Sequence, residues 1–235
     1  PGMTPRRIAG LWARLMADLG YGRYGAQGGD WGSAISLELG LAEPRRVLGI
    51  HLNFIAGRFL FGGTISQTPD DPVARDYLAK LRAWWDSEGG YNHQQGTRPQ
   101  TLAFGLADSP AGLAAWIIEK FRVWSDWKDD FESLFGRDEL LDNVMLYWLG
   151  STAATTRLYY ESRAQPLSLS PANRVAPPVG MALFPKEIPL PPRALVEPAM
   201  TIARWTEMPR GGHFAAMEQP ELLAEEMRAF FRPLR

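Results

Sequence analysis

The chain opens with a strongly amphipathic helical pattern. Residues 4–19 place apolar side chains at helical spacing, with Thr4 in the N-cap position and Pro5 at the first helical position. Gly20 follows as a terminator, because glycine readily takes the left-handed conformation that ends many helices. The pattern therefore predicts a helix over 4–19.

Two short segments follow, at 21–27 and 47–54, and we interpret each as a buried strand. The first comes directly after the helix. The segment 33–41 between them has a helical pattern, and Pro44 ends it. Helix, strand, helix and strand in this order are typical of a parallel sheet with helices packed on it. We therefore expect an α/β fold with a mostly parallel sheet flanked by helices.

The middle of the chain, 58–171, is almost entirely helical in pattern and rich in tryptophan. One amphipathic helix starts at Ser109, and another covers 138–159, where Gly150 either kinks it or splits it. This block predicts a helical insertion that covers the sheet as a cap.

Beyond the cap, 164–178 is rich in Pro, Ser and Ala and is typical of a linker that returns to the sheet. Strand-like runs at 179–183 and 202–208 follow, and Pro220 opens a final amphipathic helix. The end of the chain thus predicts two further strands of the same sheet.

The composition sets the scale of the molecule. With 46% hydrophobic residues, the chain can bury one core that carries an insertion, so we expect core parts at 1–57 and 172–235 around a cap at 58–171. The net charge of −1 and the absence of Lys/Arg blocks give no sign of nucleic-acid binding. No apolar run is long enough to span a bilayer.

Cysteine is absent, which excludes disulfides, thiolate catalysis and cysteine metal sites. Its absence fits a reducing compartment, so we expect a cytoplasmic location, and we expect no metal and no cofactor.

The chain starts at Pro1 with a helix almost at once. We therefore expect that the natural N-terminus lies upstream.

The segment Gly28-Gly29-Asp30-Trp31-Gly32 lies between a predicted strand and a predicted helix. This is the context of a nucleophile elbow, in which flanking glycines allow a sharp turn that exposes the central side chain. The alternative interpretation is a glycine-rich turn that carries a solvated Asp30.

A carboxylate at the elbow defines the chemistry. It is ionised at neutral pH and can attack an electrophilic carbon without a base, forming an alkyl ester. Hydrolysis of that ester then needs a general base and an oxyanion hole. The backbone N–H of Trp31 is the expected oxyanion donor, by the geometry of the elbow.

Three histidines are candidates for the base. His51 lies in a predicted buried strand and is expected to be structural. His93 lies in the cap and lines either a pocket or the surface. His213 lies in a Gly-Gly loop after a predicted strand, and it fits the order nucleophile, acid, histidine, although a lone histidine is more often a surface residue.

The acid that orients the base is expected just after the strand that precedes the strand of His213. Glu187 fits this position, and Glu197 and Glu207 are rivals. A lone glutamate here is more often a solvated loop residue. The end of a parallel strand, where this kind of fold places its sites, favours Glu187.

Seven segments together resemble the microsomal-type epoxide hydrolases, which include the juvenile hormone epoxide hydrolases. They are QGGDWGS (27–33), HLN (51–53), DSPAGLAAWIIEKF (108–121), DNVMLYW (142–148), TTRLYYES (155–162), FPKE (184–187) and RGGHFAAMEQPELLA (210–224). The resemblance implies an α/β-hydrolase fold with a helical cap and hydrolysis of a small hydrophobic epoxide by water. It leaves oligomerisation open.

The resemblance also implies roles for individual residues. Asp30 becomes the nucleophile, Glu187 and His213 the charge-relay pair, and Tyr91 and Tyr159 the cap tyrosines that hold the epoxide oxygen.

A phenol suits that role, because the alkoxide formed on ring opening is far more basic than a phenolate. Tyr159 lies about three helical turns after Trp148, so both are expected on one face, while Tyr160 is rotated by roughly 100°. Trp148 and His93 are therefore expected to line the substrate pocket. The alternative for the tyrosines is aromatic packing within the cap.

One departure concerns the His-Gly-x-Pro loop, which supplies a second oxyanion donor in that family and is absent from this sequence. The first strands of the sheet are expected to be missing too. An unpaired strand edge would follow, so we expect the 235 residues alone to be poorly stable and weakly active.

Three other functions are open at this point. A haloalkane dehalogenase also uses an elbow aspartate, and Trp31 would then contact the halide. A degenerate hydrolase that only binds a hydrophobic ligand is another class, although Asp30, Glu187 and His213 argue against it. A serine hydrolase using Ser33 is disfavoured, because Ser33 is off the centre of the elbow.

Overall fold

The computed structural model describes residues 2–57 and 71–235. Its sheet has four parallel strands, which lie side by side in chain order. They are β1 (Tyr24–Gly28), β2 (Val47–Leu52), β3 (Val175–Leu183) and β4 (Met200–Glu207). Because all four are parallel, their carboxyl ends meet at one edge of the sheet.

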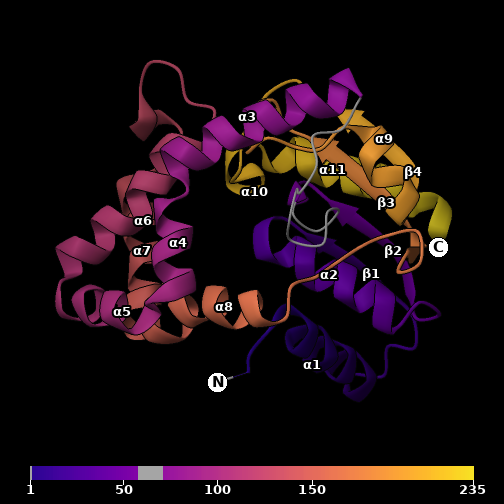
Figure 1. Ribbon diagram of the computed structural model, residues 1–235, viewed down its shortest axis with the longest axis horizontal. Coiled ribbons are helices and arrows are strands. Elements are labelled where there is room, and N and C mark those ends of the chain that lie inside the picture. The colour runs from indigo at the N-terminus through magenta and orange to yellow at the C-terminus, as the bar shows by residue number, and fades with distance from the viewer. Residues whose placement is uncertain (1, 58–70) are drawn as a thin grey trace.

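Helices cover both faces of this sheet (Figure 1). On one face, Gly40 of α2 (Asp30–Ala42) lies so close to Ile50 that a Cβ atom would stand 2.5 Å from the Ile50 side chain. On the other face, Phe230 of α11 (Pro220–Phe231) lies as close to Gly180. Glycine at these contacts lets each helix approach the strands.

The helix predicted over 4–19 is observed as α1 (Pro5–Asp18). The Thr4 side chain accepts a hydrogen bond from the Arg7 N–H, and Gly20 follows the helix with φ of 83°. Small residues form its buried face, namely Ala9 and Ala13. Three of its large apolar side chains are exposed instead, namely Leu11, Trp12 and Leu15, and so is Leu19, which follows the helix.

A group of helices between β2 and β3 lies to one side of the sheet (Figure 1). They are α3 (Pro72–Glu88), α4 (Gly90–Thr97), α5 (Pro99–Asp108), α6 (Pro110–Trp124), α7 (Arg137–Leu149) and α8 (Thr152–Ala164). The short helices α9 (Arg193–Val196) and α10 (Ala215–Glu218) lie in the later part of the chain. Residues 58–70 of the predicted cap lie outside the described residues, and the domain boundaries stay a prediction.

The long helix predicted over 138–159 is split. Helix α7 ends at Leu149, and α8 begins at Thr152 with Ser151 as a side-chain cap. The argument that placed Trp148 and Tyr159 on one face was therefore wrong, because helical phase does not continue across the break.

Several strand boundaries also differ from the prediction. Strand β1 begins at Tyr24 rather than Tyr21 and lies at the edge of the sheet. Strand β3 begins at Val175, inside the predicted linker, although it contains Pro177 and Pro178. Its pairing with β2 starts only at Val179, so the prolines, which lack an N–H, lie outside that ladder.

Candidate active site

The turn from β1 to α2 has the strained backbone of an elbow. Asp30 has φ of 42°, and it is the one non-glycine residue with positive φ among those that the structure describes. A Cβ atom on Gly28 would stand 2.1 Å from the carbonyl oxygen of Gly32. Glycine at position 28 therefore permits the turn, and the turn presents the Asp30 side chain at the start of a helix.

Three side chains that follow three different strands meet at the carboxyl edge of the sheet. The Nε2 atom of His213 lies 3.0 Å from Oδ2 of Asp30, and its Nδ1 atom lies 2.6 Å from Oε1 of Glu187. The side chains of His213 and Glu187 are 4% and 1% exposed, whereas that of Asp30 is 46% exposed. Glu187 and His213 are thus shielded from solvent, whereas the Asp30 carboxylate is accessible.

The electrostatics of this trio are dominated by its carboxylates. Burial alone would lower the pKa of His213, but the charges and hydrogen bonds of Glu187 and Asp30 outweigh it and raise the pKa to about 10. The raised pKa favours the protonated imidazole, whose Nε2 atom faces the Asp30 carboxylate at 3.0 Å. Any process that removes the charge of Asp30 also removes part of what holds this proton.

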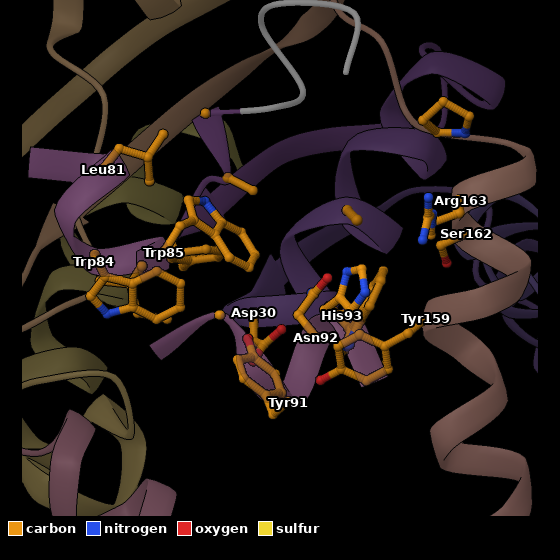
Figure 2. Close-up of a pocket in the computed structure, with 18 of the residues that line it drawn as sticks. Asp30, Leu81, Trp84, Trp85, Tyr91, Asn92, His93, Tyr159, Ser162 and Arg163 are labelled. Carbon is orange, nitrogen blue, oxygen red and sulfur yellow. The ribbon is translucent and has the colours of Figure 1, made fainter. Parts of the chain in front are cut away.

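Two tyrosines approach Asp30 from the cap. Tyr91 comes from α4 and Tyr159 from α8, and their ring centroids are 5.8 Å apart at nearly a right angle. Figure 2 shows both rings beside Asp30, with the hydroxyl of Tyr159 pointing toward Tyr91. The Tyr159 ring also contacts Trp31 edge to face at 4.9 Å.

Burial raises the pKa of Tyr159 well above its ordinary value, and the charge of Asp30 raises it further. Hydrogen bonding by the Trp31 side chain opposes this shift. The phenol therefore keeps its proton across the neutral and mildly alkaline range and is available as a hydrogen-bond donor.

Two cavities meet at these side chains. One measures about 1150 Å³ and the other about 280 Å³, and both are lined by Asp30, Trp31, Tyr91 and Tyr159. Other residues of the larger cavity that Figure 2 labels are Leu81, Trp84, Trp85, Asn92, His93, Ser162 and Arg163. The smaller one is bounded mainly by the cap, including Leu106, Leu113, Trp116, Ile117 and Tyr147. The walls are mostly apolar and aromatic.

Of the two other predicted pocket residues, only one lines a cavity. His93 lines the larger cavity, and its contact with a substrate stays a prediction. Trp148 lines neither of the two cavities and instead packs against the cluster of Leu106, Leu113 and Val144. The expectation for Trp148 failed because it rested on a helix that continued through residue 150.

One pocket residue was missed. Tyr147 lines the smaller cavity, and burial together with the charge of Asp30 raises its pKa. The sequence signal was its place beside Trp148 in the segment 142–148. Tyr160, by contrast, is half exposed.

The rival candidates lie elsewhere. His51 is fully buried in β2, and burial lowers its pKa to about 4, so it is not placed to exchange protons with a substrate. The Glu197 carboxylate binds Arg193 at 2.7 Å, and Glu207 is exposed at the end of β4. Ser33 is buried and donates its hydroxyl proton to the Asp30 carbonyl oxygen at 2.6 Å.

Within 2–57 and 71–235, no group of three or more His, Asp or Glu side chains is arranged to hold a metal ion.

In the same residues no single helix combines the length and hydropathy needed to cross a membrane. One bent pair of helices, Pro99–Asp108 with Pro110–Trp124, passes that test jointly at an angle of 115°.

Comparison with curated proteins identifies relatives of this chain. The Stigmatella aurantiaca (strain DW4/3-1) protein named "Putative epoxide hydrolase" is 44% identical over 100% of this chain and 52% of its own length. Juvenile hormone epoxide hydrolase 2 of Ctenocephalides felis is 39% identical over 97% of this chain and 53% of its own length. The chain is homologous to epoxide hydrolases. It spans about half the length of these relatives.

Solved epoxide hydrolases have the same fold. The structure of Aspergillus niger epoxide hydrolase matches with a TM-score of 0.81 at 28% identity, covering 100% of this chain and 59% of that one. Juvenile hormone epoxide hydrolase from Bombyx mori matches with a TM-score of 0.82 at 28% identity, over 100% of this chain and 60% of that one. The predicted α/β-hydrolase fold is thus confirmed. No family model matches the chain.

Proposed function

We propose that this chain carries the residues that hydrolyse epoxides to vicinal diols through an alkyl ester on Asp30. The observation that carries the proposal is the position of the Asp30 carboxylate, which contacts His213 at 3.0 Å and faces two tyrosines of the cap. The homology to epoxide hydrolases supports the same reaction class.

In the first step, a carboxylate oxygen of Asp30 attacks an epoxide carbon. The new C–O bond forms as the ring C–O bond breaks, and the electron pair goes to the ring oxygen. Tyr91 or Tyr159 donates a proton to that oxygen, leaving a phenolate. The phenols favour this step because they bind the oxygen most strongly as its charge develops.

Ester formation then prepares the base. It removes the charge of Asp30, one of the groups that raise the pKa of His213, so that pKa falls. His213 releases its proton, and the proton restores the phenol. The imidazole is now neutral and hydrogen-bonded to Glu187, as a general base must be.

In the second step, His213 takes a proton from water, and the hydroxide attacks the carbonyl carbon of the Asp30 ester. The N–H of Trp31 stabilises the oxyanion in our proposal. The intermediate collapses by expelling the diol oxygen, which receives the proton from His213. The Asp30 carboxylic acid then returns its proton to the imidazole, and the starting state is restored.

The substrate class follows from the cavity walls. Aromatic and aliphatic side chains dominate both cavities, so the proposed substrate is a small hydrophobic epoxide, with water as the second reactant. The chemistry requires no cofactor, because the carboxylate, the imidazole and the phenols supply every proton and electron pair.

Intact-protein and peptide mass spectrometry after incubation with styrene oxide tests the proposal. His213→Gln is expected to accumulate a covalent adduct on Asp30, because the ester forms but lacks its base. Asp30→Asn is the control and is expected to stay unmodified. The adduct reports the first step alone, so it does not depend on a second oxyanion donor. Absence of an adduct at Asp30 in His213→Gln would overturn the mechanism.

A further inference from the structure

A buried carboxylate outside the Asp30–Glu187–His213 trio holds the loop that carries the base. Glu218, the last residue of α10, is only 6% exposed, and burial raises its pKa. It has no cationic partner among the hydrogen bonds and salt bridges of the described residues. Instead it accepts hydrogen bonds from three backbone N–H groups, which is the kind of compensation that a buried carboxylate requires.

Two of these N–H groups flank the base directly. The Oε2 atom of Glu218 accepts from the Gly212 N–H at 2.9 Å, and Oε1 accepts from the Phe214 N–H at 2.9 Å. One side chain therefore holds the peptide unit between Gly211 and Gly212 and the peptide unit that follows His213.

The third N–H group belongs to the segment that follows helix α6 of the cap. Oε2 of Glu218 accepts from the Asp126 N–H at 2.8 Å, and the Asp126 carboxylate in turn accepts from the Gly211 N–H at 2.9 Å. The N–H of His213 itself donates to the carbonyl oxygen of Trp124 at 2.9 Å. Glu218 thus ties the loop to the end of α6 as well as to itself.

All four consecutive N–H groups of 211–214 consequently donate to Glu218 or to residues 124–126. The space is tight, since a Cβ atom on Gly212 would stand 2.5 Å from the Trp124 carbonyl oxygen. The Trp124 ring contacts both the His213 ring at 5.2 Å and the Tyr91 ring at 5.1 Å. The base and one of the proton donors are therefore held by the same end of α6.

We propose that Glu218, acting with Asp126, is a positioning residue that sets the place of the His213 imidazole through the backbone of 211–214. The inference rests on the proposed function, because it assigns a purpose to the position of the base. His213 must hold its bond to Glu187 and face the Asp30 ester at once, and a shift of the loop breaks that alignment. Glu218 therefore controls ester hydrolysis, which needs the base, more than ester formation, which does not.

The test separates the two steps in Glu218→Gln. The amide has nearly the same volume, but one carboxylate oxygen becomes an N–H donor that faces backbone N–H groups, so at least one of the three hydrogen bonds is lost. Single-turnover mass spectrometry with styrene oxide measures both steps. We expect ester hydrolysis to slow by about 10- to 100-fold, as small displacements of catalytic groups do, with ester formation changed far less.

Glu226→Gln is the matched control. Glu226 is equally buried at 5% exposure, but its carboxylate binds Arg204 and Thr206 and makes none of the hydrogen bonds to 211–214. We expect this variant to lose stability while the ratio of the two rates stays at the wild-type value. The comparison therefore corrects for the general effect of replacing a buried glutamate by glutamine.

If Glu218→Gln fails to fold, Asp126→Ala is a second variant that perturbs the same loop. It removes only the carboxylate that accepts the hydrogen bond from the Gly211 N–H. The same selective loss of ester hydrolysis supports the proposal. A wild-type ratio in either folded variant, or an equal loss in Glu226→Gln, overturns it. If His213→Gln itself forms no adduct on Asp30, the proposed function fails instead, and the two failures are thereby distinguished.

Discussion

At the scale of single residues, the charge of Asp30 and the proton of His213 depend on one another. The imidazolium is stabilised by two carboxylates at 2.6 and 3.0 Å, and only one of these, Glu187, remains charged once an ester has formed on Asp30. In the proposed mechanism the imidazole is therefore protonated before the first step and becomes available as a base once the ester has formed.

The raised pKa of His213 predicts a specific dependence of stability on pH. Because the folded value of about 10 lies above the unfolded value of 6.5, the proton stabilises the folded state fully below pH 6.5. That contribution is lost as pH rises through about 10. We expect the free energy of unfolding to fall between pH 6.5 and 10 in the wild type and to fall less in His213→Gln. Urea unfolding of both proteins across this range is the measurement, and parallel curves would contradict the assignment.

The tyrosines give a second prediction. Tyr159→Phe is expected to slow ester formation from an epoxide by about 100-fold or more, because a general acid is lost. Tyr160→Phe is the control on the same helix, and its side chain is 52% exposed, so the rate should not change. Stopped-flow quenching with mass detection of the ester gives the rates.

The same pair of variants separates an epoxide hydrolase from a haloalkane dehalogenase. Release of halide from a chloroalkane, if it occurs at all, needs no proton on an oxygen leaving group. Halide release by the wild type that is faster than its epoxide opening, and that Tyr159→Phe leaves unchanged, would identify the dehalogenase reaction as the better description.

The sequence predicts some of these residues and misses others for a physical reason. Glycine spacing and chain order single out Asp30 and His213, because an elbow and its partners follow a fixed order along the chain. Tyr159 is found beside Asp30, although the phase argument for it was wrong. Glu218 was missed because its importance lies in the backbone groups that it contacts, and these contacts exist only in the folded chain.

At the scale of secondary structure elements, the elbow depends on one close approach between β1 and α2. The Cβ atom of an alanine at position 28 would collide with the Gly32 carbonyl oxygen at 2.1 Å, whereas nothing lies within 4 Å of a Cβ atom at position 32. Gly28 and Gly32 are therefore not equivalent. Glycine is required at the strand end of the turn and not at the helix end.

A pair of alanine variants tests this difference. Gly28→Ala is expected to lower the free energy of unfolding by about 1–3 kcal/mol, as overpacking does, and to displace Asp30 so that ester formation is lost. Gly32→Ala is expected to keep near wild-type stability and ester formation. Thermal unfolding and adduct formation measure both effects. Equal behaviour of the two variants would show that the turn is not set by this contact.

Element boundaries follow from the sequence only where a local signal fixes them. The start of α1 at Thr4 and Pro5 and the start of α6 after Ser109 are both confirmed, because each has a capping side chain next to a proline. The break at Gly150 offered two outcomes, and only packing of the cap decides between a kink and a split. Strand β3 extends into proline-rich sequence because its neighbour β4 pairs with it there.

At the scale of the whole molecule, two surfaces of the core stand without a covering element in the described residues. Strand β1 pairs with β2 alone, so its outer edge has no strand beside it. Several large apolar side chains of α1 and of the residue that follows it are exposed, with Leu11 at 52%, Trp12 at 50% and Leu19 at 61%. Exposed strand edges and contiguous apolar surface both favour association between chains.

The 235 residues taken alone are therefore expected to be poorly stable, to self-associate and to turn over epoxides weakly. Sedimentation velocity and urea unfolding measure the first two properties, and diol formation from styrene oxide measures the third. Leu11→Gln combined with Leu15→Gln should reduce association without changing the Asp30 adduct, because α1 supplies no member of the trio. A monomeric chain with high, lasting turnover would contradict the expectation. It would mean that the strands and the trio of the described residues suffice for both steps.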